Sequence, residues 1–174
     1  MASIVLCGVC DNRFHIPFSN RKYMDRTGGL NICSIDCVAT WVERQHGRRV
    51  TNYPDIIEHK APLIQSAKDL QKNRLAFRST FELLFAEFAV LKALAFQYEP
   101  YTIPVGKNKA QTTYKPDFYF PEHRCFVEVK GLYYPGARKK VKNFRSIYNI
   151  PLLVFPWYAR GSMYEAYEKV TVVK

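Results

Sequence analysis

Residues 114–131 of this chain read YKPDFYFPEHRCFVEVKG. Two short apolar runs, rich in aromatic and β-branched residues, predict one strand over 117–120 and a second over 125–130. The four residues between them, 121–124, include Pro and two basic side chains and predict a hairpin loop. Because loop length fixes the register of an antiparallel pair, the facing residues of the two strands can be read from the sequence.

The register of this hairpin brings three charged side chains together. Counting back from the loop places Asp117 directly opposite Glu128. Lys130 lies on the same face, because residues two apart on a strand point the same way. Two carboxylates opposed at about 4.5–5.5 Å repel each other unless a cation lies between them. We therefore expect Asp117 and Glu128 to bind Mg²⁺ (or Mn²⁺).

This set of residues suits the hydrolysis of a phosphodiester. That reaction needs a metal to neutralise the phosphoryl oxygens and lower the pKa of water, and a cation near the attacking water. We expect Asp117 and Glu128 to bind the metal, and Lys130 to orient or help deprotonate the water.

A helix predicted upstream of the hairpin supplies a further acidic residue. Apolar positions recur at helical spacing over 79–97, and Ser79 with Glu82 three positions later resembles a capping box. Glu82 is expected to complete the inner or outer shell of the metal. Glu87 is the alternative acid, but it lies five positions later and therefore projects from a different side of the helix.

The N-terminal part of the chain predicts a zinc site. Cys7 and Cys10 form one close pair, Cys33 and Cys37 form a second, and two such pairs can supply four thiolates to one tetrahedral metal. Soft sulfur ligands in this number select zinc. The second pair precedes a predicted helix over 38–45, an order that resembles treble-clef zinc fingers. A structural Zn²⁺ would hold this short segment folded.

Two features of this module stay open in the sequence. His15 or His46 is an alternative to one of the cysteine ligands. The module can contact another protein, or it can contact DNA through its basic residues Arg13, Arg21, Lys22 and Arg26.

The chain is strongly basic, with a net charge of +11, and more than half of the excess lies in residues 132–174. A cationic surface attracts the phosphates of nucleic acids. An amphipathic helix predicted over 136–148 is expected to follow the DNA backbone through Arg138, Lys139, Lys140, Lys142 and Arg145.

Three segments of different composition divide the chain of 174 residues. We predict a four-cysteine zinc-finger module over 1–47, a linker with a short helix at 63–73 over 48–73, and a nuclease domain over 74–174. The order helix, strands, helix, strand makes the fold class α/β. The remaining predicted elements are an extended segment over 97–105, a polar loop over 106–112 and a strand over 151–155.

No apolar run approaches the roughly 18 residues that a membrane span needs. Five cysteines in close pairs or alone are more typical of metal ligands and buried thiols in a reducing compartment than of disulfides. We expect a soluble cytoplasmic protein, of a bacterial cell or a phage-infected host.

Six motifs within residues 77–140 keep their order and near-constant spacing. They are Phe77-Arg78-Ser79-x-x-Glu82, Tyr98-Glu99, Ile103-Pro104, Tyr114-x-Pro116-Asp117-Phe118, Phe126-Val127-Glu128-x-Lys130-Gly131-Leu132 and Arg138-Lys139-Lys140. Together they resemble the endonuclease I family of T7-like bacteriophages, whose members resolve branched DNA.

This resemblance implies a restriction-endonuclease-like PD-(D/E)XK core, in which helices flank a mixed sheet, and dependence on Mg²⁺. It implies catalytic roles for Glu82, Asp117, Glu128 and Lys130, and we expect Arg78 to contact DNA. The cysteine module is a departure from the phage enzymes.

The function expected from sequence is that of a Mg²⁺-dependent DNA endonuclease, acting as a homodimer on branched or structured DNA. One alternative is a sequence-directed homing, nicking or transposon-type endonuclease of the same superfamily. The other is a non-catalytic zinc-finger DNA-binding protein.

Overall fold

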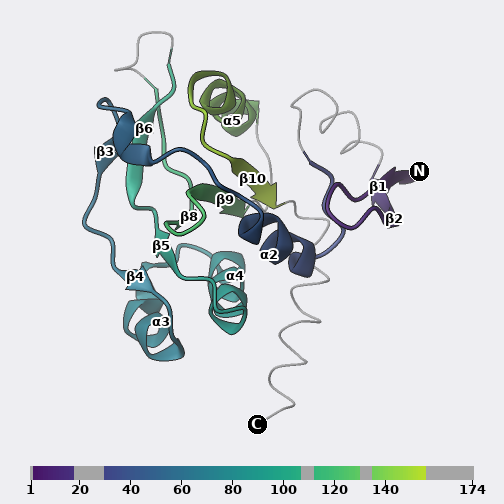
Figure 1. Cartoon of the computed structure of the whole chain (residues 1–174), viewed down its shortest axis with the longest axis horizontal. Helices are drawn as coiled ribbons and strands as arrows, with labels where there is room; N and C mark the ends of the chain where they lie inside the picture. Colours follow the sequence, from purple (N-terminus) through teal and green to yellow (C-terminus); the bar gives the residue numbers. More distant parts are fainter. Residues whose placement is uncertain (1, 18–29, 107–111, 130–134, 156–174) are drawn as a thin grey trace.

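A mixed sheet with helices on both faces forms the centre of the molecule (Figure 1). The structure is a computed structural model that describes residues 2–17, 30–106, 112–129 and 135–155. In chain order the elements are β1 (Ala2–Leu6), β2 (Arg13–Pro17), α2 (Ile35–Glu43), a 3₁₀ turn (Val50–Asn52), β3 (Ile57–Glu58), β4 (Leu63–Ile64), α3 (Ala67–Asn73), a second 3₁₀ turn (Arg74–Ala76), α4 (Thr80–Leu91), β5 (Phe96–Tyr98), β6 (Tyr101–Pro104), β7 (Thr113–Tyr114), β8 (Phe118–Phe120), β9 (Cys125–Val129), α5 (Pro135–Ile147) and β10 (Leu152–Phe155).

The largest sheet has five strands in the order β10-β9-β8-β5-β4. β10 runs parallel to β9, and the other neighbours in this sheet are antiparallel. A parallel pair needs a crossover connection, and α5 supplies the helix of that crossover. A smaller antiparallel sheet joins β3, β6 and β7. The α/β class predicted from sequence is confirmed by this mixture of a mixed sheet and helices.

The β8–β9 hairpin has the predicted register. Phe118 faces Val127 and Phe120 faces Cys125, and residues 121–124 form the turn between the two strands. The prediction succeeded because a four-residue loop leaves one register that buries both apolar runs.

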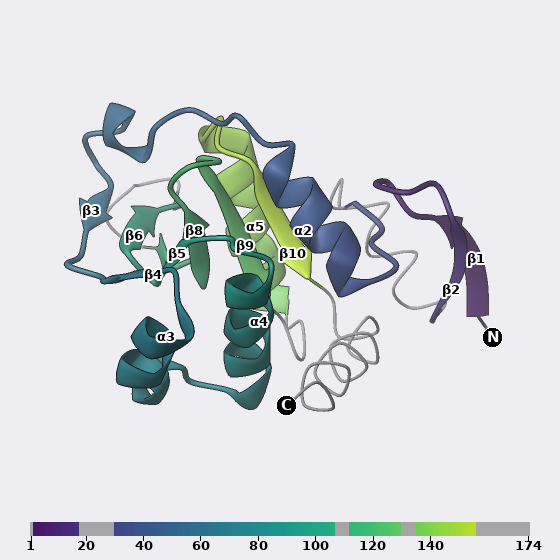
Figure 2. The ribbon, with the colours of Figure 1, turned by 60° about the horizontal axis from the view of Figure 1, so that its bottom comes forward.

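Alternation along β8 and β9 divides the apolar core into two layers. Phe118 and Val127 belong to the layer that includes residues of α2 and α4, whereas Tyr119 and Phe126 belong to the layer of α5. Figure 2 shows α4 and α5 on opposite faces of the sheet. Because both faces are covered, every residue of β8 and β9 is buried, including Glu128 in β9.

α4 begins where the sequence predicted and ends six residues earlier than the predicted limit of 97. Ser79 caps the helix, since its hydroxyl accepts the Glu82 N–H at 3.2 Å. The helix stops because Ala93 adopts a left-handed φ of 54°. The Ala93 N–H donates to Val90 O and the Leu94 N–H donates to Ala89 O, which is the Schellman pattern.

The other predicted elements differ from the structure at their ends. α5 begins one residue before the predicted helix and β10 one residue after the start of the predicted strand. α2 begins earlier, because Ser34 caps it by accepting the Cys37 N–H. The short helix predicted from residue 63 starts at Ala67 behind the capping Ser66, and Leu63–Ile64 form an edge strand instead.

The N-terminal part of the chain is packed onto the sheet. Apolar residues of α2 share one buried cluster with residues of α4, β8 and β9. Asp36 of α2 pairs with Lys92 at the end of α4, at 2.7 Å. Beyond α2, a Cβ added at Gly47 would lie 2.2 Å from Arg124 O and 2.4 Å from Pro151 Cδ, so a glycine is needed where the chain crosses the hairpin loop. The division into a module, a linker and a nuclease domain stays a prediction.

The β1–β2 hairpin was not predicted. None of the helices in the described part of the chain has the length and apolar content to cross a membrane. Most of the polar loop predicted over 106–112 falls on residues 107–111, which lie outside the described ranges.

Replacing Ala93 by Gly is expected to stabilise the fold by about 0.5–1 kcal/mol, because a left-handed residue with a Cβ costs roughly 1–2 kcal/mol and the added chain entropy offsets only part of that gain. Urea unfolding checks this free energy. The matched control is Ala86→Gly in the interior of α4, which is expected to destabilise by about 1 kcal/mol or more. A destabilised Ala93→Gly protein would contradict the Schellman assignment.

Candidate functional site

Two buried carboxylates lie side by side at the open end of the β8–β9 hairpin. The Asp117 N–H donates to Glu128 Oε2 at 3.1 Å. In return, the Val129 N–H donates to Asp117 Oδ2 at 2.8 Å. Asp117 is 0% exposed and Glu128 is 1% exposed. Each carboxylate is therefore oriented by a backbone amide of the opposite strand, and their predicted juxtaposition is confirmed.

β5 reaches the same carboxylates from the other side of β8. Its pairing sets Tyr98 against Phe118, and the next residue, Glu99, donates its N–H to Asp117 O at 2.8 Å. Glu99 has a φ of 45°, in the left-handed region that a long side chain rarely adopts. Such a conformation persists only where the surrounding contacts hold it.

Arg78 brings a positive charge to the carboxylate pair. Its guanidinium forms an ion pair with Glu99, and its Nη2 lies 3.7 Å from Asp117 Oδ1. The Arg78 side chain is 61% exposed, so it reaches the buried Asp117 from the solvent side. A cation at this position reduces the repulsion between neighbouring buried carboxylates.

Glu82 is connected to this pair through Arg78, and it also binds Tyr98. Glu82 Oε2 accepts the Tyr98 hydroxyl at 2.5 Å and the Arg78 backbone N–H at 3.0 Å. Burial, together with the hydrogen bond to Glu82, raises the pKa of Tyr98, so its phenol remains a donor. Glu82 is itself buried at 8% exposure. Glu87, the alternative acid, lies further along α4, where burial raises its pKa despite the nearby Arg74.

A pocket of about 360 Å³ opens beside Glu128. Three basic side chains contribute to its wall, namely Arg78, Lys115 and Lys140, together with Thr113, Tyr114 and Ala137. Sequence reasoning assigned DNA contact to Arg78 and Lys140 but missed Lys115. The available signal was its position in the sequence, two residues before Asp117, in the segment that links β7 to β8.

The remaining predicted residues are distributed differently. Lys130 lies outside the described residues. Arg138, Lys139 and Lys142 are exposed on α5. Arg145 is half-buried near the end of α5 and donates to Leu152 O at 3.0 Å, so part of its bonding capacity serves the packing of α5 on β10.

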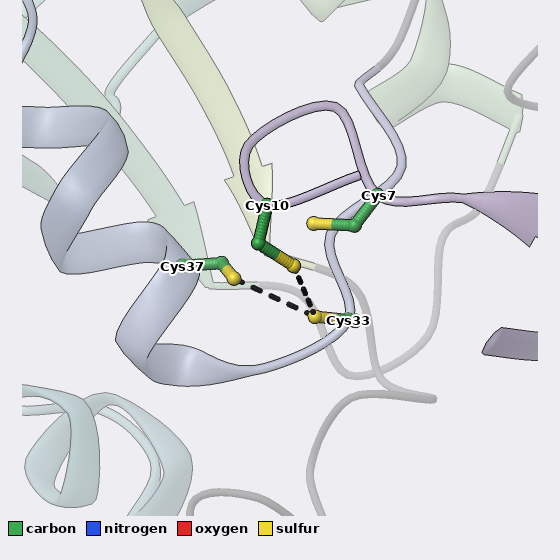
Figure 3. A group of neighbouring side chains, drawn as sticks. All are labelled: Cys7, Cys10, Cys33 and Cys37. Atoms are coloured by element: carbon green, nitrogen blue, oxygen red, sulfur yellow. Dashed lines mark hydrogen bonds between the residues drawn. The ribbon is translucent and has the colours of Figure 1, made fainter. Parts of the chain in front are cut away.

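The four paired cysteines also converge (Figure 3). Cys7 and Cys10 come from the turn after β1, Cys33 precedes α2, and Cys37 lies in its first turn. Their Sγ atoms all lie within 4.8 Å of one another, and Cys33 Sγ is 3.5 Å from those of Cys10 and Cys37. Zn–S bonds of about 2.3 Å in a tetrahedron separate sulfurs by about 3.8 Å, so the cluster has the size of a zinc site.

The backbone around the cluster favours thiolates unevenly. Burial opposes ionisation of Cys7, but hydrogen bonds from the backbone of Cys10, Cys33 and Val9 outweigh it and lower the pKa of Cys7 to about 7. For Cys33, burial and the neighbouring thiols raise the pKa. A soft divalent cation would stabilise all four thiolates together, so the cluster is compatible with zinc.

The carboxylate site offers a different set of donors. Asp117, Glu128 and Glu82 present oxygen atoms, which are the ligands that hard divalent cations prefer. Two adjacent buried carboxylates with one nearby guanidinium have negative charge left to neutralise. The residues present therefore fit a cation such as Mg²⁺.

In this mixed α/β fold one of two paired carboxylates, Glu128, lines a pocket with three basic side chains, a combination that suits a nuclease. The chain is 38% identical over 65 residues to "Endonuclease I" of Escherichia phage T7. The match covers 37% of this chain and 43% of the phage protein, so the chain spans less than half the length of this relative. The partial likeness supports a relationship to nucleases. No protein-family model matches the chain, and no solved structure matches it.

The cysteine cluster is expected to carry one equivalent of Zn²⁺, and Cys33→Ser is expected to lower the content below about half an equivalent. The melting temperature should fall as well, because α2 shares its apolar cluster with the sheet. Metal analysis of freshly reduced protein checks the first effect and thermal unfolding checks the second. Cys125→Ala is the matched control, since this fifth cysteine lies in β9 outside the cluster and should keep its zinc.

Proposed function

We propose that this protein is a Mg²⁺-dependent DNA endonuclease that hydrolyses phosphodiester bonds. The observation that carries the proposal is the buried Asp117–Glu128 pair, which is oriented by backbone amides and of which Glu128 lines a pocket together with basic residues. The partial likeness to a phage endonuclease supports the same activity.

Three acidic residues are assigned to the metal. Asp117 and Glu128 hold it directly, and Glu82 completes its inner or outer shell. A bound Mg²⁺ would neutralise charge on the phosphoryl oxygens and lower the pKa of water. Lys130, two residues after Glu128, orients the attacking water or helps to deprotonate it. Pro116-Asp117 and Glu128-x-Lys130 then constitute the PD-(D/E)XK motif of a restriction-endonuclease-like core.

Basic residues bind the phosphates of the substrate. Arg78, Lys115 and Lys140 surround the pocket beside Glu128, where a phosphate would meet both the cationic wall and the carboxylate site. Arg138, Lys139 and Lys142 present further charge along α5. Contacts of this kind grip the DNA backbone and favour recognition by shape over the reading of bases. Arg145 is assigned a weaker contribution, because it also bonds to Leu152.

The proposed substrate is branched or structured DNA, and the proposed active form is a homodimer. One chain contains one set of Glu82, Asp117, Glu128 and Lys130, so it cuts one strand per binding event. Two opposed cuts need two sites, which a twofold dimer supplies at a fixed distance. One observation supports the alternative of a sequence-directed endonuclease. The cysteine cluster is compatible with a zinc module, and such a module can add contacts to bases.

Replacing Asp117 by Asn or Glu128 by Gln is expected to lower Mg²⁺-dependent nicking of supercoiled plasmid by at least about 10³-fold, because the metal loses a charged ligand. DNA binding in Ca²⁺ should be unchanged or tighter. Without divalent metal each variant should melt no lower than the parent protein, since one of two adjacent buried charges is removed.

The matched control is Glu122→Gln, an exposed acid in the turn of the same hairpin, which should cut at the parent rate. Retained Mg²⁺-dependent nicking by either site variant would exclude the assignment. A parent protein that binds DNA but cuts no substrate with Mg²⁺ or Mn²⁺ would favour the non-catalytic zinc-finger alternative.

Specificity is tested by titrating an immobile four-way junction against linear duplex of the same sequence in Ca²⁺, with the mass of the complex from light scattering. We expect a dimer that binds the junction at least about tenfold more tightly, because basic surfaces on two subunits can contact two arms at once. A monomer that binds both substrates equally would favour the sequence-directed alternative.

A further inference from the structure

Two neighbouring residues with no assigned role, Tyr98 and Glu99, contact three residues of the proposed active site. The Tyr98 hydroxyl donates to Glu82 Oε2 at 2.5 Å. The Glu99 carboxylate pairs with Arg78, and its backbone N–H donates to Asp117 O at 2.8 Å. One end of β5 therefore touches residues that come from α4, from the segment before α4, and from the residue preceding β8.

We propose that Tyr98 and Glu99 are positioning residues of this nuclease site. Tyr98 fixes the carboxylate of Glu82, and Glu99 holds the guanidinium of Arg78 at the pocket, where it meets a phosphate of the DNA. The inference rests on the proposed function and adds to it the residues that orient the outer part of the site.

Packing against neighbouring aromatic rings holds the Tyr98 ring independently of its hydrogen bond. The ring centroid lies 4.6 Å from that of Phe77 and 5.5 Å from that of Phe118. An aromatic ring held on two sides has little rotational freedom, so its hydroxyl occupies one place. That place is within hydrogen-bond distance of Glu82, whose carboxylate also accepts the Arg78 backbone N–H. Tyr98 thereby selects one orientation of the Glu82 carboxylate.

Glu99 holds Arg78 because Glu99 is the more rigid partner. Arg78 is 61% exposed, and a long exposed arginine samples many rotamers unless it is held. Glu99 is 19% exposed, its φ of 45° sets its direction, and its N–H is bound to Asp117. The ion pair therefore orders the arginine around the glutamate, and it leaves the guanidinium 3.7 Å from Asp117 Oδ1.

Repulsion of DNA is an alternative role for Glu99, and it predicts the opposite change in kcat when the charge of Glu99 is removed. A carboxylate near the pocket also repels DNA, so its removal strengthens binding by electrostatics alone. If Glu99 only repels DNA, a variant in which it is neutralised should bind DNA more tightly and turn over at least as fast as the parent protein. If Glu99 positions Arg78, the same variant should bind DNA as well as the parent protein or more tightly, but turn over more slowly.

The variants are Tyr98→Phe, Glu99→Gln and Glu99→Asn, and each is compared with the parent protein for kcat and KM on plasmid DNA in Mg²⁺. DNA binding is measured separately in EDTA. We expect kcat to fall by about 10- to 100-fold in each, the range for a lost hydrogen bond to a charged group, with KM and binding within a few-fold. Glu99→Asn guards against misfolding, because asparagine tolerates a left-handed φ.

A double-variant cycle separates positioning from general structural damage. If Glu99 acts through Arg78, Arg78→Ala combined with Glu99→Gln should turn over at the rate of Arg78→Ala alone. The matched control is Tyr101→Phe, which removes another tyrosine–glutamate contact, the 3.4 Å contact with Glu58, and should leave kcat unchanged. Equal losses of melting temperature in Tyr98→Phe and Tyr101→Phe, with loss of kcat only in the former, support positioning.

Two negative results are distinguishable. A parent protein that cuts no DNA overturns the proposed function and this inference with it. A parent protein that cuts DNA, while the Tyr98 and Glu99 variants match its kcat, overturns the inference alone. Strictly additive losses in the double-variant cycle would show that Glu99 does not work through Arg78.

Discussion

The site depends on a reciprocal pair of hydrogen bonds, in which the backbone of each strand in the β8–β9 hairpin binds the carboxylate of the other. The Asp117 N–H holds Glu128, and the Val129 N–H holds Asp117. Both carboxylates are buried, so their mutual repulsion is weakly screened and opposes folding. Backbone amides and the Arg78 guanidinium offset part of that cost. A proposed cation would offset the rest, and the stability of the protein should therefore rise when metal is added.

Stability and orientation of the hairpin come from the layers on both of its faces. α2 and α4 cover one face and α5 covers the other, so that the strand carrying Glu128 cannot shift without disturbing both layers. The cysteine cluster contributes through α2, whose first turn carries Cys37 and whose apolar side joins the same buried layer as α4. A metal bound by the cysteines would therefore also stabilise α2 and the layer that covers one face of the sheet.

The sequence predicted those parts of the structure that depend on local rules. Loop length and strand alternation placed Asp117 against Glu128, and the capping residue Ser79 placed the start of α4. Cysteine spacing placed all four sulfurs. The predicted end of α4 was wrong, because Ala93 adopts a left-handed backbone conformation that is unusual for alanine. Local patterns indicated no role for Tyr98 and Glu99, because the partners of these residues are set by the long-range pairing of β5 with β8. The placement of Lys130 stays a prediction.

The parallel pairing of β10 with β9 has a consequence for how the protein matures. Glu128 faces Val154, so the strand that flanks the second carboxylate is made only after α5 has been synthesised. A nascent chain ending at Val129 already contains Glu82, Asp117 and Glu128, but it lacks the outer neighbour of β9 and the layer that covers one face of the hairpin. Non-local pairing of this kind is slow compared with hairpin closure. The proposed site would therefore reach its final packing only after β10 has been synthesised, later than the hairpin that carries both carboxylates.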